Sequence, residues 1–182
     1  MIAIMSSPLD ALFFGSVSRT LSASESLFLT GDAVAVIYRV RAGRIALNRT
    51  TPQGTVLLLQ TAGEGDVLAE ASTYSDRYHC DAVALEPCAV EAVPKADFAR
   101  ALASDRSLAE AWERRLAHAV QEARMKSEIR TLRTVAERLD AWRSAKDGGL
   151  PPKGQWQELA SELGVSREAL YRELARRNRR SS

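Results

Sequence analysis

Side chains able to read DNA bases gather near the C-terminal end of the sequence. An arginine can bond bidentately to O6 and N7 of guanine, and a glutamate can accept a hydrogen bond from N4 of cytosine. The candidate residues for contacts with DNA are Ser166, Arg167, Glu168, Tyr171, Arg172 and Arg176. Residues 143–182 carry nine Lys or Arg against five Asp or Glu, a local net charge of +4, whereas the rest of the chain carries −2. This basic excess favours a negatively charged partner at that end.

The apolar residues of the same segment predict two short helices joined by a tight turn. Gly164 stands where a helix needs a residue of positive φ to end, and Ser166 suits the cap of the next helix. Val165 can fill the angle between the two helices. The expected buried faces consist of Leu159, Ala160, Leu163, Leu170 and Leu174. The pattern predicts a helix-turn-helix whose second helix, residues 166–176, enters the major groove. The alternative is a plain helical hairpin with a solvated charged face.

Spacing separates the arginines of this segment into two groups. Arg167 and Arg172 lie in the first turns of the expected second helix, which carry the base contacts in this docking mode. The later arginines lie a turn or more beyond, where the helix leaves the groove. We therefore expect Arg176, Arg177, Arg179 and Arg180 to contact phosphate or nothing.

Residues 26–93 read as a series of short strands. Apolar and β-branched runs alternate with turn sequences such as Gly31-Asp32, Thr51-Pro52-Gln53-Gly54 and Gly63-Glu64-Gly65-Asp66. Strands are expected at 27–29, 34–40, 45–47, 56–59, 82–85 and 89–93. Short strands at this spacing indicate a β-sandwich or barrel rather than a parallel sheet with crossover helices, and the helices that follow make the fold class α+β.

The chain lacks proline and glycine from residue 97 to residue 144 and reads as helical there. Apolar side chains recur on one stripe at intervals of three and four: Leu108, Trp112, Leu116, Ala119 and Ala123. The stripe either covers the β domain or forms a dimer seam as in a coiled coil, and we expect the seam because a helix over about 107–129 would be about 34 Å long. A break at 131–134 is a candidate hinge. The expected domains are 1–102, the long dimerisation helix 103–130, and the DNA-binding part 131–182.

Few residues of the sequence support metal binding, redox chemistry or catalysis. The cluster Tyr78-His79-Cys80 could ligate a metal or haem only with help from His118 or a second copy, and the plainer interpretation is a small buried thiol beside a loop histidine. A redox role for Cys80 is a further alternative. No nucleophile elbow, phosphate-binding loop or paired metal motif occurs, so we expect no enzyme, no metal and no cofactor. The sequence also lacks an export signal and a membrane span, which predicts a cytoplasmic protein.

The order of β-sandwich, long helix and helix-turn-helix over residues 25–176 resembles the Crp-Fnr family, typified by the cyclic-AMP receptor protein and the fumarate–nitrate reductase regulator. The residues that carry the resemblance are Gly31-Asp32, Gly43, Gly65-Asp66-Val67-Leu68-Ala69-Glu70 and 159–174. The resemblance implies a jelly-roll-like β-sandwich similar to a cyclic nucleotide-binding domain. It also implies a homodimer that reads two half-sites, with Arg167, Glu168 and Arg172 at base-reading positions.

The sequence departs from the family in two places. The cyclic-nucleotide cassette begins Gly-Glu-Leu in the family and Ala69-Glu70-Ala71 here. The family has an Arg-Ser pair later in the cassette, and this sequence has Tyr78-His79-Cys80 near the corresponding positions instead. The candidate pocket residues are Glu70, Arg77, Tyr78, His79 and Cys80. Without the guanidinium that neutralises the phosphate, we predict no response to cyclic AMP and leave the effector open. The family also adds a β wing after the recognition helix, and we expect little or none here.

The sequence therefore predicts a homodimeric, DNA-binding transcription regulator that reads an inverted repeat of double-stranded DNA. RNA polymerase is a further candidate partner, and no membrane is expected as one. The alternative is a β-sandwich sensor or scaffold that has lost DNA binding and acts through protein partners.

Overall fold

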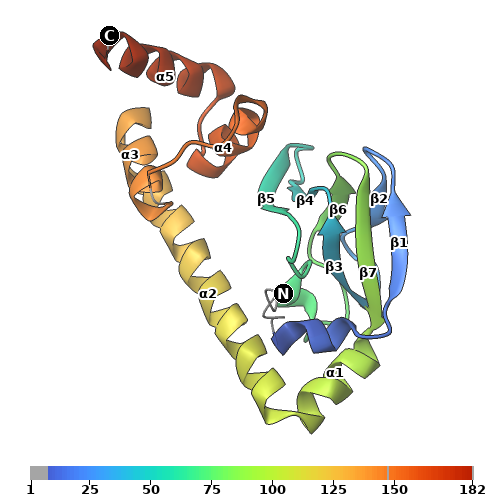
Figure 1. The fold of residues 1–182 in the computed structure, drawn as a ribbon. Coiled ribbons are helices and arrows are strands. Elements are labelled where there is room, and N and C mark those ends of the chain that lie inside the picture. Colours follow the sequence, from blue (N-terminus) through green and yellow to red (C-terminus); the bar gives the residue numbers. More distant parts are fainter. Residues whose placement is uncertain (1–7, 147, 182) are drawn as a thin grey trace, which may run out of the picture. The chain divides into compact units, whose positions relative to one another are not determined.

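The computed structural model describes residues 8–146 and 148–181, which fall into two compact units, residues 1–118 and 119–182 (Figure 1). The strands are β1 Val17–Leu21, β2 Ser26–Phe28, β3 Val36–Ala42, β4 Ile45–Thr50, β5 Val56–Ala62, β6 Asp81–Ala84 and β7 Cys88–Pro94. The helices are α1 Lys95–Ser104, α2 Arg106–Thr131, α3 Val135–Ala145, α4 Trp156–Leu163 and α5 Arg167–Ser181. Short 3-10 turns add η1 Pro8–Phe13, η2 Glu70–Ser72 and η3 Lys153–Gln155.

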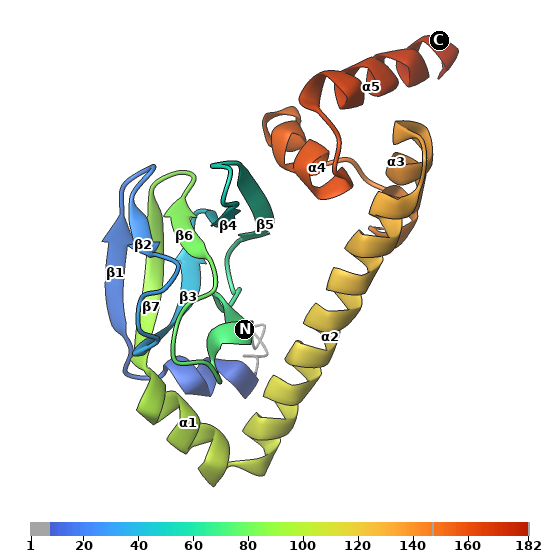
Figure 2. The same ribbon diagram turned by 180° about the vertical axis from the view of Figure 1, so that it is seen from behind.

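The first unit is the predicted β-sandwich (Figure 2). One antiparallel sheet has the order β1-β7-β3 and the other the order β2-β6-β4-β5. Val40 and Val90 from the first sheet and Ile45 and Ala82 from the second are completely buried, so the two sheets share one core. This confirms the fold class. The prediction missed β1, a strand at the edge of its sheet with only Leu21 buried, because such a strand lacks an apolar alternation.

Gly43 links β3 to β4 at a crowded corner of this unit. Its φ is +81°, and a Cβ there would lie 2.6 Å from the Pro87 carbonyl oxygen and 2.7 Å from Cys88 Sγ. Only glycine fits both the backbone conformation and the space. The glycine that carries part of the family resemblance is therefore required by the packing of the hairpin.

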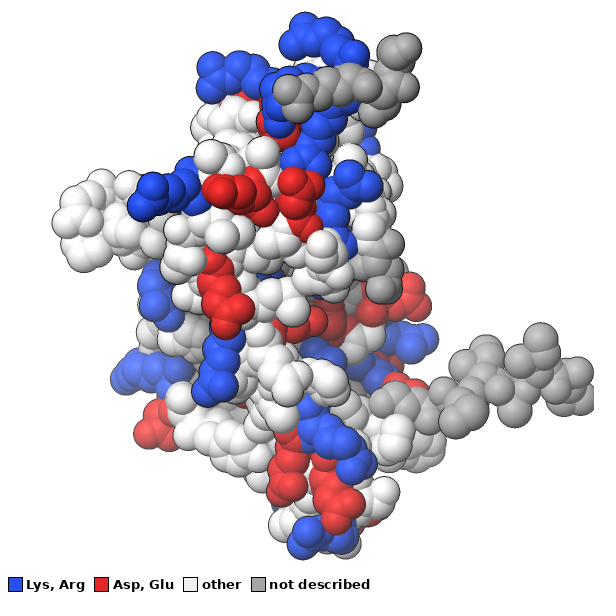
Figure 3. All heavy atoms as spheres, turned by 90° about the vertical axis from the view of Figure 1, so that its left-hand side faces the viewer, with Lys and Arg blue, Asp and Glu red and all other residues white. Residues whose placement is uncertain are grey.

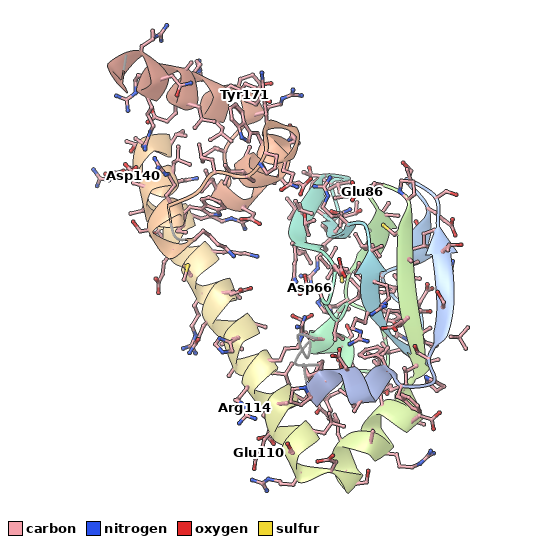
Figure 4. All side chains as sticks on the ribbon, viewed as in Figure 1. Asp66, Glu86, Glu110, Arg114, Asp140 and Tyr171 are labelled. Atoms are coloured by element: carbon pink, nitrogen blue, oxygen red, sulfur yellow. The ribbon has the colours of Figure 1, made fainter. Side chains whose placement is uncertain are left out.

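The helices α1 and α2 close one end of the sandwich. Phe98 of α1 packs edge-on against Trp112 of α2 with 5.1 Å between ring centroids, and both side chains are almost completely buried. Arg115 of α2 pairs with Asp66, with 3.3 Å between Nη2 and Oδ1 (Asp66 is labelled in Figure 4). Leu108 and Trp112, predicted for a dimer seam, thus belong to the core of the unit and leave almost no surface for a second copy.

The rest of the predicted stripe differs from its first two members. Leu116 packs against the sandwich core but is only partly buried, Ala119 is half-buried and Ala123 is exposed. Val120, which the stripe did not include, is also exposed. Of the predicted stripe, only the part from Leu116 onward therefore keeps surface that a second copy could contact.

The second unit is built from the end of α2 and the helices α3, α4 and α5. The expected break after α2 is present, since Thr134 and Glu137 form a capping box that starts α3. The core of the unit consists of Ile129, Leu139, Leu159, Ala160, Leu163, Leu170 and Leu174. It contains all five apolar residues predicted to face inward from the two last helices. The second of these, α5, is longer than the predicted 166–176.

Candidate nucleic-acid interface

The turn between α4 and α5 has the geometry that the sequence predicted. Gly164 adopts φ +64° and ψ +41°, and the Val165 amide donates to the Ala160 carbonyl at 3.0 Å. The hydroxyl of Ser166 accepts a hydrogen bond from the amide of Ala169 at 3.2 Å, which caps the start of α5. The turn thus ends α4 at Gly164 and starts α5 at the Ser166 cap.

The first turns of α5 present the predicted base-reading residues. Arg167, Glu168 and Arg172 are exposed, whereas Leu170 and Leu174 on the opposite face are buried. Tyr171 is half-buried, and its ring meets the ring of Trp156 in α4 edge-on with 5.1 Å between centroids (Tyr171 is labelled in Figure 4). A helix with one face in the core and polar side chains on the other can enter a groove.

Glu168 keeps its negative charge at the start of this helix. A hydrogen bond to its own backbone amide and another to the Ser166 hydroxyl lower the pKa of the carboxyl below its ordinary value. The positive end of the α5 dipole favours the same charge state. Glu168 is therefore an acceptor at neutral pH, as contact with a cytosine amino group requires.

Two later arginines are held in an ion-pair network that the sequence did not reveal. Arg176 bonds bidentately to the Glu173 carboxylate, with both distances 2.8 Å. Arg177 donates to Glu173 at 2.6 Å and to Asp140 of α3 at 3.0 Å, and also to the Ala136 carbonyl (Asp140 is labelled on α3 in Figure 4). These arginines lower the pKa of the nearly buried Glu173 to about 2, through hydrogen bonds and charge.

The network divides the arginines of α5 by their surroundings. Arg177 is largely covered and fastens α5 to α3, whereas the side chain of Arg176 is 43% exposed and keeps part of its surface. Arg172 and Arg179 are exposed. Figure 3 shows blue Lys and Arg side chains gathered over the end of the unit that holds α5. This surface carries the positive charge that a phosphate backbone would attract.

The candidate pocket residues of the sandwich lie in different surroundings. Tyr78 is buried, stacks on Phe28 with 3.7 Å between ring centroids, and donates its hydroxyl to the Val36 carbonyl. Cys80 is also buried, and burial raises the pKa of its thiol to about 11. Both are structural in these surroundings, and a protonated thiol is a poor nucleophile and metal ligand.

The other three candidates lie nearer the surface. Arg77 is exposed, and its guanidinium donates to the Gly31 carbonyl at 2.7 Å. Glu70 begins η2 and is half-buried. A hydrogen bond of 2.7 Å joins His79 Nδ1 to the hydroxyl of Ser72, which lies in η2 and is fully buried. The structure thus brings His79 to the η2 turn that Glu70 begins, whereas the Arg77 guanidinium is bonded to the carbonyl of Gly31.

Comparison with known families decides what this sandwich is. Residues 18–105 match the family model of the cyclic nucleotide-binding domain. Over these residues the sandwich is similar to the cyclic nucleotide-binding domain. No curated protein matches the sequence.

Solved structures extend the likeness beyond the cyclic nucleotide-binding domain. FixK2 from Bradyrhizobium japonicum is 16% identical, with a TM-score of 0.77 and coverage of 91% of this chain and 86% of that one. CLP from Xanthomonas campestris, a c-di-GMP-responsive global regulator, is 19% identical, with a TM-score of 0.71 and coverage of 96% and 92%. A CRP-family transcriptional regulator from Thermus thermophilus is 18% identical, with a TM-score of 0.65 and coverage of 90% and 85%. The fold is that of the Crp-Fnr regulators, as the sequence resemblance implied.

The surroundings of His79 set the charge of its ring. Burial, and next the charge of Arg49, lower the pKa of His79, so its ring is neutral at pH 7. Arg49, which the sequence did not single out, donates to the His79 carbonyl at 3.2 Å. Ser72 was also missed, because it follows the cassette residues without a motif of its own. The described neighbours of His79 thus include the Ser72 hydroxyl and the guanidinium of Arg49.

Within residues 8–146 and 148–181, no group of three or more His, Cys, Asp or Glu side chains is placed to hold a metal ion. Over the same part of the chain, every helix is too short or too polar to cross a bilayer.

Proposed function

We propose that the chain is a DNA-binding transcription regulator that works as a homodimer and reads an inverted repeat. The observation that carries this proposal is the arrangement of α4, the Gly164–Ser166 turn and α5. It supports a helix-turn-helix, because Arg167, Glu168 and Arg172 lie exposed in the first turns of a helix whose other face is core.

The surroundings of each arginine suggest its role in this proposal. Arg167 and Arg172 are the base-reading candidates, and Ser166 and Tyr171 support them at the start of the helix. Arg179 is exposed one or more turns later and is the candidate for a phosphate contact. Arg176 can add to that contact only with the part of its side chain that Glu173 leaves uncovered. Arg177 instead holds α5 on α3.

The proposed dimer uses the part of α2 that the sandwich does not cover. Leu116, Ala119 and Ala123 continue the predicted stripe, and Val120 adds an exposed apolar side chain beside them. Pairing of this surface with its copy would resemble the seam of a coiled coil. Two recognition helices related by twofold symmetry would then read half-sites about 34 Å apart.

The sensor is proposed not to respond to cyclic AMP, because the described cassette region offers a neutral His79 in place of a phosphate-binding arginine. CLP is c-di-GMP-responsive, and we propose that the effector of this chain is likewise a molecule other than cyclic AMP. We further propose that the chain is not an enzyme, that it works in the cytoplasm, where its DNA partner lies, and that RNA polymerase is a candidate partner.

A mobility-shift assay with a salt titration tests the proposed function. Wild-type protein should bind a site selected from random DNA, and its affinity should fall steeply as salt rises. Arg167→Ala/Arg172→Ala should lose this binding. The control is Arg114→Ala/Arg124→Ala, which removes the same charge from exposed positions on α2 and should keep it. Folded wild-type dimer without salt-sensitive DNA binding would favour the scaffold alternative.

A further inference from the structure

The C-terminal end of α4 is held by an arginine from the end of α2. Arg130 donates from Nε to the Glu162 carbonyl at 3.2 Å and from Nη2 to the Ser161 carbonyl at 3.0 Å. The last carbonyls of a helix have no partner within the helix, and they carry the negative end of its dipole. A guanidinium placed there forms charge-assisted hydrogen bonds, which are stronger than neutral ones.

A second arginine holds the turn itself. Arg138 of α3 donates from Nη1 to the carbonyls of Leu163 at 3.0 Å and Gly164 at 2.9 Å. Its Nε donates to the carbonyl of Leu132, just after the end of α2, at 2.9 Å. Arg138 therefore joins the C-terminal ends of two helices through one guanidinium.

Together the two arginines bind four successive carbonyls at the end of α4 and in the turn, one of which, that of Ser161, also accepts from the Gly164 amide. The carbonyls of residues 161–164 each accept from Arg130 or Arg138, and the Ala160 carbonyl accepts from the Val165 amide. Gly164 also lies close to the stem of Arg130, since a Cβ there would be 3.3 Å from Arg130 Cγ. The glycine is thus needed both for its positive φ and for the approach of the arginine.

We propose that Arg130 and Arg138 form a clamp that makes the turn before α5 move as one body with the end of α2. Both are positioning residues for DNA reading: they act through the backbone of residues 161–164, which sets the start of α5. This inference rests on the proposed function for its effect on DNA. Through the clamp, the end of α2 is hydrogen-bonded to the turn from which α5 starts.

The hydrogen bonding of the two arginines separates this role from a phosphate contact. The hydrogen bonds of Arg130 and Arg138 go to backbone carbonyls, so a large part of their donor capacity is already engaged in the unit. Arg130 is nevertheless exposed, so its removal leaves the core of the unit intact. A phosphate contact, in contrast, would contribute to the salt dependence of binding.

The first test measures amide hydrogen exchange in the free, full-length protein. Arg130→Ala should speed exchange of the Gly164 and Val165 amides by about tenfold, because the turn loses two charge-assisted bonds. Arg130→Lys keeps the positive charge but loses the paired N–H donors of the guanidinium. Its exchange rates at the two amides should lie between those of Arg130→Ala and wild type. Arg124→Ala, an exposed arginine of the same helix, should leave both amides unchanged. Unchanged exchange in Arg130→Ala would overturn the clamp even if DNA binding were normal.

The second test measures the effect on DNA reading. Arg130→Ala should reduce the preference for the selected site over single-base variants by about tenfold, with the slope of affinity against salt unchanged. If Arg130→Ala lowers the slope of affinity against salt by about one and keeps the full preference for the selected site, Arg130 is a phosphate contact and the proposal is overturned. If wild-type protein binds no DNA, the proposed function and the role in DNA reading both fail, and the exchange result still decides whether the clamp exists.

Discussion

The guanidinium of Arg167 lies over the ring of Tyr171, with 5.2 Å between Cζ and the ring centroid. The same ring packs edge-on against Trp156 of α4. Arg167 is therefore the outer member of a stack that starts in the preceding helix. A cation over an aromatic face is attracted by the ring, and this contact limits the conformations of an arginine before DNA is bound.

Replacement of Tyr171 tests this preorganisation. Tyr171→Ala should weaken binding to the selected site by about 1 kcal/mol, because Arg167 loses its contact with the ring. Tyr171→Phe keeps the ring and should bind as wild type does. The measurement is a titration of labelled DNA with each variant. An equal loss in both variants would show instead that the Tyr171 hydroxyl itself contacts DNA.

Glu173 should make the stability of the second unit depend on pH. Its pKa in the folded protein, about 2, lies below the ordinary value of about 4.3. The ion pairs therefore stabilise the fold fully above pH 5, and this contribution is lost as the pH falls toward 2. Glu173→Gln should cost about 1.5–3 kcal/mol at pH 7 and less at pH 3. Urea unfolding at both pH values checks this, and an equal cost at both would contradict the network.

The seam on α2 predicts a difference between two identical substitutions. Ala123→Glu places a charge on the proposed seam and should give a folded monomer that binds DNA weakly. Ala117→Glu makes the same change at an exposed position on another face of α2 and should remain a dimer. Sedimentation at micromolar concentration measures both. A wild-type monomer, or a dimeric Ala123→Glu, would rule out this seam.

Trp112 gives a contrasting prediction. Because its side chain is packed against Phe98 inside the first unit, Trp112→Ala should destabilise that unit by about 3–5 kcal/mol. Thermal unfolding followed by circular dichroism measures the loss. If Trp112→Ala is stable but monomeric, Trp112 belongs to the dimer seam instead.

Cyclic AMP should leave the melting temperature unchanged. A ligand selective for the folded state adds about 2.7 kcal/mol of stability at a hundredfold excess over its Kd. The neutral His79 gives the phosphate no positive charge, so we expect no such gain at millimolar cyclic AMP. AMP is the matched control. A rise in melting temperature with cyclic AMP alone would show that another group, such as Arg49, neutralises the phosphate.

The sequence predicted those features that depend on neighbouring residues. The Gly164 turn, the Ser166 cap and the buried leucines of α4 and α5 follow from local spacing and are present in the structure. Helical periodicity also placed Trp112 on an apolar stripe. Periodicity alone does not predict which element an apolar stripe packs against. In the structure, Trp112 packs into the core of the sandwich.

Interactions between distant residues left no local signal. Arg177 and Asp140 are 37 positions apart, and nothing in either segment marks the other as a partner. Arg130 and Arg138 bind backbone carbonyls, which every residue has, so the sequence contains no matching side chain to find. The Ser72–His79 bond was missed for a related reason, because its two members lie on either side of a turn without a recognised motif.

The comparison of Arg172→Ala with Arg179→Ala tests the central claim most directly. Both are exposed arginines of α5, and the preferred site of wild-type protein with its single-base variants supplies the DNA. Arg172→Ala should cost about 1–3 kcal/mol on the preferred site and relax the preference at one base pair of each half-site. Arg179→Ala should weaken all sequences alike and lower the salt slope by about one. If Arg172→Ala keeps the full discrimination of the wild type, α5 does not read DNA with this face.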